Sequence, residues 1–253
     1  MWSRRSVATS RPREQSEGWR SPVITAAVLC PAPPLLHPGL TGQQAVVPEL
    51  RAACAQAAGR LLRDDPEVIV VAGPATATGE WDAAGRLDPA AYAPGVARTE
   101  TGSLPLPLPL GLGAMLLDQA GFRGRRRLLA VGQDEPASAC AALGAAIAAS
   151  QDRTALLVMG DGSARRTLRA PGYLDPRAAF FDAEVERAVR AGELDALLGL
   201  DQALARDLMA TGRPAWQVLA GAMRDLAPAA EVLYCADPFG VAYLVACLRP
   251  ADP

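Results

Sequence analysis

The chain has 253 residues, of which half are hydrophobic, and its formal net charge is −2. This balance is typical of a globular protein with a sizeable core, and it leaves no basic surplus to attract nucleic acid or an anionic membrane surface. All 25 basic residues are arginine, which excludes a lysine nucleophile.

The first 21 residues carry five arginines among Ser, Glu, Gln and Gly and show no apolar period. We expect a disordered basic extension at 1–21, followed by a single domain at 22–250. The apolar segment 23–30 is too short, and ends in too many prolines, for a good signal peptide. No stretch approaches the roughly 20 apolar residues of a membrane span. Five widely spaced cysteines without a Cys-x-x-Cys pair disfavour a disulfide framework and a zinc site, so we expect a cytoplasmic protein.

Apolar runs and helical periodicities alternate along the chain. The runs predict strands at 23–29, 68–72, 127–131, 155–159, 231–235 and 241–248. Between them, Ala- and Leu-rich stretches predict helices at 48–63, 111–121, 137–150, 178–190, 193–199, 201–211 and 214–226. This alternation predicts an α/β fold with three layers, in which a mostly parallel or mixed central sheet is flanked by helices.

The Pro- and Gly-rich segment 73–109 is too long for a simple connector. We expect it to cross the sheet edge or the mouth of a pocket, with Trp81, Asp82 and Tyr92 packed over that mouth. Its Leu-Pro repeats at 104–110 favour an extended surface segment, since proline does not continue a helix.

The predicted strand 155–159 runs into Gly-Asp-Gly-Ser-Ala-Arg-Arg. Ligands of parallel sheets sit beyond the carboxyl ends of the strands, so Asp161, Ser163, Arg165 and Arg166 are candidate ligand-binding residues. The two arginines would hold a carboxylate or phosphate, with help from the backbone amides of the Gly-Ser turn. The alternative is an inert turn in which Asp161 or Ser163 caps the next segment and the arginines face water or form salt bridges.

Two further strand ends are expected to open on the same crevice. The first strand ends at Cys30-Pro-Ala-Pro-Pro and the second at Gly73-Pro-Ala-Thr, which adds Cys30 and Gly73 to the candidates. Ser163 and Cys30 are also possible nucleophiles, but neither has a histidine within sequence reach to act as its base.

The three strand ends carry a resemblance to a known family. Over most of residues 23–248 the chain resembles the class III extradiol ring-cleavage dioxygenases of the LigB type, whose fold is shared by Memo-like proteins. Members read Pro-His-Pro-Pro, Ser-Pro-His and Gly-Asp-Leu-Ser-His at the strand ends where this chain reads Pro-Ala-Pro-Pro, Gly-Pro-Ala and Gly-Asp-Gly-Ser-Ala. The later segments 181–182, 212–213, 219–221 and 237–243 are similar as well.

The resemblance implies a non-haem Fe(II) bound by two histidines and a carboxylate, with a third histidine as the acid–base catalyst of catechol cleavage. The two metal-ligand positions fall on Ala32 and Ala75, and the catalytic position falls on Ala164. Asp237 is the available carboxylate. The chain's single histidine, His37, cannot replace three imidazoles and is expected to be a partly exposed loop residue.

We therefore expect a member that has lost Fe(II) and ring cleavage, with no metal or cofactor, and that keeps a crevice for a small anionic or aromatic molecule or a partner. The alternatives are an active Fe(II)-dependent extradiol dioxygenase, or a metal-free enzyme on the same fold. A homo-oligomer is a further possibility, because family members often work as oligomers.

Overall fold

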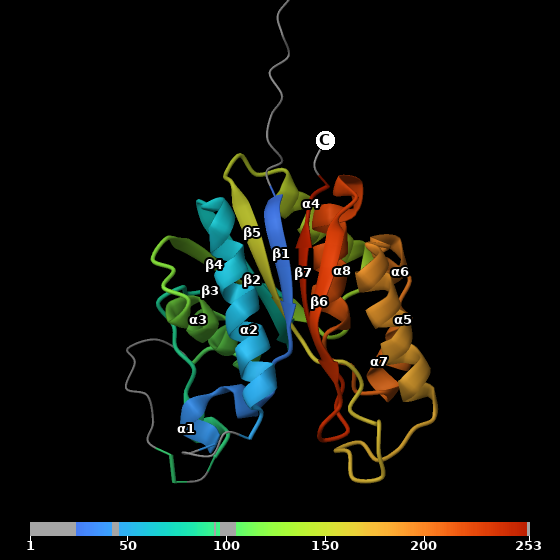
Figure 1. Ribbon diagram of the computed structural model, residues 1–253. Coiled ribbons are helices and arrows are strands. Elements are labelled where there is room, and N and C mark those ends of the chain that lie inside the picture. The colour runs from blue at the N-terminus through green and yellow to red at the C-terminus, as the bar shows by residue number, and fades with distance from the viewer. Residues whose placement is uncertain (1–23, 42–45, 94, 97–104, 252–253) are drawn as a thin grey trace, which may run out of the picture.

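The computed structural model describes residues 24–41, 46–93, 95–96 and 105–251. A seven-stranded sheet forms the centre of the molecule, and helices lie on both of its faces (Figure 1). The strands are β1 (Ile24–Cys30), β2 (Val68–Ala75), β3 (Gly79–Trp81), β4 (Arg125–Gly132), β5 (Thr154–Met159), β6 (Ala229–Ala236) and β7 (Tyr243–Arg249). The helices are α1 (Pro38–Thr41), α2 (Pro48–Leu61), α3 (Leu108–Gln119), α4 (Ala137–Ala148), α5 (Arg177–Ala191), α6 (Leu194–Leu198), α7 (Gln202–Asp207) and α8 (Arg213–Met223).

The strand order is β3-β4-β2-β5-β1-β7-β6. The four strands β4, β2, β5 and β1 are mutually parallel, while β3, β7 and β6 are each antiparallel to a neighbour. At the centre of the sheet, Leu156 of β5 is in register with Ala27 of β1 on one side and Val70 of β2 on the other. The predicted α/β fold with a mixed, mostly parallel sheet is therefore confirmed.

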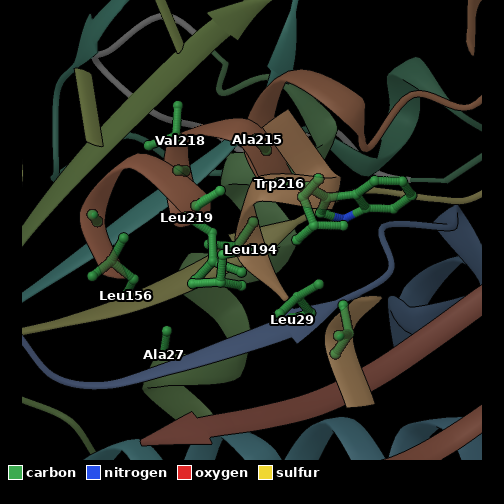
Figure 2. Close-up of a cluster of buried hydrophobic side chains, with 14 of the residues drawn as sticks. Ala27, Leu29, Leu156, Leu194, Ala215, Trp216, Val218 and Leu219 are labelled. Atoms are coloured by element: carbon green, nitrogen blue, oxygen red, sulfur yellow. The ribbon is translucent and has the colours of Figure 1, made fainter. Parts of the chain in front are cut away.

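Successive side chains of each strand point to opposite faces of the sheet, which divides the core into two apolar layers. Ala27 and Leu29 of β1 belong to the layer under α8, where they face Trp216 and Leu219 (Figure 2). The intervening Val28 belongs to the opposite layer, with α2 and α3. The central strands are buried on both faces, which explains why they read as continuous apolar runs rather than as alternating patterns.

All six predicted strands are present, with ends that differ by a few residues, but β3 was not predicted. The expectation of an extended surface segment at 104–110 was wrong for its second half. Helix α3 begins at Leu108 and carries Pro109 in its first turn, where no N–H is needed. Leu106 and Leu110 are both buried.

The expected extension at 1–21, and Val23 of the first predicted strand, lie outside the described residues. Within the described part of the chain, no helix has the length and apolar character to cross a membrane.

Candidate functional site

The carboxyl ends of β2, β5 and β1 lie side by side at one edge of the sheet, the lower edge in Figure 1. The three ends converge as expected, because the strands are adjacent and parallel. The backbone N–H of Gly160 donates to the carbonyl oxygen of Cys30 at 2.9 Å. Beyond this bond, the N–H of Ala32 donates to Oδ1 of Asp161 at 2.7 Å. The ends of β1 and β5 are thus held together by direct hydrogen bonds.

The three alanines at the positions where the resemblance expects histidines are in apolar surroundings. Ala32 and Ala164 are 5% and 8% exposed and belong to one apolar cluster, which also contains Met159 and Tyr243. Ala75 is half-buried and packs against the same cluster. At all three positions, the chain therefore presents a methyl group to an apolar environment.

Asp161 is the carboxylate at these strand ends. Burial raises its pKa to about 6, against the opposing effect of the hydrogen bond from Ala32. Burial also raises the pKa of Tyr243, and the nearby Asp161 charge adds to this effect. The backbone of Asp161 is fixed as well, because its carbonyl accepts from the N–H of Gly212 at 2.8 Å. Asp161 is a positioned carboxyl group that can change its protonation near neutral pH.

Two of the predicted residues bind acidic side chains within the protein. The hydroxyl of Ser163 is buried and donates to Oδ2 of Asp182 at 2.5 Å, and its N–H donates to Oδ1 at 2.8 Å. Nε of Arg166 donates to Oδ2 of Asp237 at 2.8 Å, and its Nη1 lies 3.7 Å from Asp182. Ser163 is therefore not a free nucleophile, and Arg166 forms the salt bridge that the inert alternative predicted. Asp237, the carboxylate expected from the resemblance, is Arg166's partner.

The turn after β5 has glycine at positions 160 and 162 because other parts of the protein pack closely against its backbone there. A Cβ on residue 160 would lie 2.4 Å from the Cα of Gly212, and one on residue 162 would lie 2.8 Å from both the Ala242 Cβ and the Asp182 Oδ1. The N–H of Gly162 donates to the carbonyl oxygen of Ala242 at 2.8 Å. The amides of Gly162 and Ser163 are thus already bonded, which corrects the expectation that they would bind an anion.

The remaining predicted residues differ in their surroundings. Arg165 is half-buried, makes no ion pair with a described residue, and has a buried Nε without an acceptor there. Cys30 is 1% exposed, and a hydrogen bond with Cys54 together with burial raises the pKa of its thiol, so it is no nucleophile. Gly73 allows β2 to approach α3 closely, since a Cβ there would lie 2.7 Å from the Cβ of Pro109.

A cavity of about 500 Å³ opens beyond the end of β2. Its walls come from the end of β2 and the residues that follow it, from β3, from residues 88–92 and from the Leu-Pro segment, and include Ala75, Trp81, Asp88, Tyr92 and Pro105–Pro109. Trp81 and Tyr92 line the cavity as expected, whereas the carboxylate of Asp82 accepts from the N–H of Ala84 in its own turn. Residues 105–109 belong to the segment that was expected at a sheet edge or a pocket mouth, but no single residue among them was named as a lining residue. The leucines that alternate with the prolines could have indicated this role, because repeated apolar side chains favour a segment that packs against the protein over one that is fully exposed.

The residues at the strand ends do not fit an Fe(II) centre of the family type. In the described part of the chain, no group of three or more His, Cys, Asp or Glu side chains is placed to hold a metal ion. Asp161 accepts from the backbone N–H of Ala32, while Asp182 and Asp237 bind Ser163 and Arg166. His37 lines a different cavity along α3, where its Nδ1 accepts from the N–H of Gly39 at 3.1 Å.

Comparison with known proteins finds a structural neighbour. No protein-family model matches the chain, and no curated protein matches it. Among solved structures, the chain is similar to the crystal structure of an uncharacterized protein, JW3007, from Escherichia coli K12. The two are 15% identical with a TM-score of 0.54, and the match covers 89% of this chain and 99% of the other. At this identity, the likeness establishes that the fold occurs in another protein of similar extent.

Proposed function

We propose that this chain is a non-catalytic relative of the class III extradiol ring-cleavage dioxygenases, and that it binds a small aromatic molecule beyond the end of β2. The observation that carries the proposal is the position of Ala75. This residue stands where the resemblance expects a metal-binding histidine, and it forms part of the wall of the 500 Å³ cavity that Trp81 and Tyr92 also line. An aromatic ligand fits this cavity because ring faces stack well on Trp and Tyr, and because the remaining lining is rich in Pro and Leu.

The loss of ring cleavage follows from the donor atoms of the side chains. A facial triad needs two neutral imidazoles and a carboxylate, with open positions for the catecholate and dioxygen. Ala32 and Ala75 supply no donor atom, and Ala164 cannot accept or deliver a proton. The single carboxyl group of Asp161 offers at most one ligand. These strand ends can therefore contribute to the binding of a ligand but not to ring cleavage.

The five cysteines agree with a reducing compartment. All five are free, and four of them are buried among apolar side chains, which is the usual role of an unpaired cysteine. We therefore place the protein in the cytoplasm.

Catechol and protocatechuate are the probes for this proposal. Both are expected to raise the melting temperature of the wild-type protein, and Trp81→Ala is expected to weaken their binding by about tenfold, the loss of one good stacking partner. Tyr173→Ala is the matched control, because Tyr173 is 62% exposed and lies outside the cavity lining. Equal binding by wild type and Trp81→Ala would refute the assigned cavity. Ring-fission colour on exposure of the Fe(II)-treated protein and catechol to air would refute the loss of catalysis.

A further inference from the structure

A second cavity, of about 270 Å³, lies under the residues that precede α8. Its lining consists of Gln133, Gln202, Ala205, Arg206, Met209, Ala210, Thr211 and Arg213. Ala205 and Ala210 belong to the apolar layer on the α8 side of the sheet, whereas the cavity at the end of β2 adjoins the α2 and α3 side. The lining contains two guanidinium groups, two amides and a hydroxyl, and no carboxylate.

Arg213 is the central group of this cavity. It is 2% exposed, and its guanidinium donates to Oε1 of Gln217 at 2.8 Å and to the carbonyl oxygens of Gln133 and Glu135 at 2.6 and 2.9 Å. All three acceptors are uncharged, and no described carboxylate lies within ion-pair distance. Because an arginine has five N–H donors, two remain without an acceptor in the described part of the chain. Burial of such a charge without a counter-ion is costly, as the lowered pKa of Arg213 reflects.

Arg206, the other arginine of the cavity, forms its ion pair at the protein surface. Arg206 forms an ion pair with Asp134, whose side chain is 78% exposed while that of Arg206 is 62% exposed. Exposed pairs of this kind contribute little to stability, so the Arg206 side chain can exchange this partner for another at small cost. Of the two guanidiniums, only that of Arg206 has a carboxylate partner within ion-pair distance among the described residues, and this partner is exposed.

We propose that this cavity binds a small organic carboxylate, independently of the aromatic site. The carboxylate group lies between the guanidiniums of Arg213 and Arg206, since a planar guanidinium matches the two oxygens of a carboxylate. The carbon skeleton of the ligand contacts the apolar part of the lining, formed by Ala205, Met209 and Ala210. The volume admits a molecule of a few carbon atoms.

The test is titration calorimetry of the full chain with succinate, acetate and inorganic phosphate. We expect succinate to bind at one site. Arg206→Ala should weaken its binding by at least about tenfold, the loss of one charge-assisted contact, and Arg213→Met should abolish it. Arg190→Ala is the matched control, because Arg190 is an exposed arginine of α5 paired with Glu186.

Binding of none of the three anions, or unchanged succinate binding in Arg206→Ala, would overturn the proposal. Binding of phosphate but not of succinate or acetate would overturn the carboxylate assignment. Should Arg213→Met fail to fold, Arg206→Ala decides the question, since its side chain is exposed. Catechol binding by Arg206→Ala should equal that of the wild type, which separates this site from the aromatic one.

Discussion

Asp161 makes the stability of the protein depend on pH in a direction opposite to that of most carboxylates. Its pKa is about 6 in the folded state, above the ordinary value of 3.8, because burial disfavours the charged form. Well below pH 3.8 the carboxyl group is protonated in both the folded and the unfolded state, so it does not lower the stability of the fold. Between pH 3.8 and 6 the folded state holds the proton more tightly, so the contribution of Asp161 to stability falls as the pH rises.

Well above pH 6 the carboxyl group is ionised in both states, so the loss in the free energy of unfolding caused by burying its charge no longer changes with pH. A shift of about two pKa units corresponds to about 3 kcal/mol, at about 1.4 kcal/mol per unit. Asp161→Asn removes the charge and keeps an oxygen that accepts from the N–H of Ala32. The variant should therefore be more stable than the wild type by about 3 kcal/mol at pH 8, which is about 6–12 °C in Tm for a chain of this size. At pH 3.5 this gain should vanish.

Urea denaturation of both proteins at pH 3.5, 5, 6, 7 and 8 measures this difference directly. Asp225→Asn is the control for loss of one negative charge, because the Asp225 side chain is 94% exposed. A stability difference between Asp161→Asn and wild type that is the same at every pH would refute the reasoning, as would a variant that is less stable at pH 8.

Three further substitutions follow from packing and hydrogen bonding. Gly144→Ala should destabilise the protein by about 2 kcal/mol, because its Cβ would lie 2.1 Å from the carbonyl oxygen of Val218 where α4 crosses α8. Gly59→Ala in α2 should instead stabilise it by about 0.5–1 kcal/mol, since nothing lies within 4 Å of the added Cβ. Ser163→Ala should cost about 1–3 kcal/mol by removing the hydroxyl donor to the half-buried Asp182 carboxylate. Thermal denaturation at pH 7 checks all three, and the reverse order of the two glycine variants would contradict the packing described here.

The fold was predictable where burial dictates the sequence. Strands β1, β2 and β5 are buried on both faces and therefore appear as apolar runs. Strand β3 was missed because Gly79-Glu80-Trp81 has only three residues and its first two are exposed, so the strand depends on pairing with β4 rather than on its own pattern. Helix α3 was expected to begin three residues too late, because Pro107 before it and Pro109 in its first turn were read as helix breakers.

The convergence of the strand ends was predictable, but the partners of the side chains were not. Arg166 meets Asp237, 71 residues away in the chain, and nothing local in either segment indicates this pair. Arg213 was missed as a cavity residue although a signal existed. It stands four residues before Gln217 in an otherwise apolar helix whose residues are all buried, and two polar residues at that spacing indicate a buried polar contact.

We propose that methyl groups stand in place of the two iron-binding histidines at the ends of β1 and β2, and in place of the catalytic histidine after β5. Anaerobic incubation with excess Fe(II), followed by desalting and elemental analysis of the iron that stays with the protein, tests it most directly. We expect no stoichiometric iron, with the same result for Asp161→Asn. One tightly held iron per chain, lost in Asp161→Asn, would contradict it.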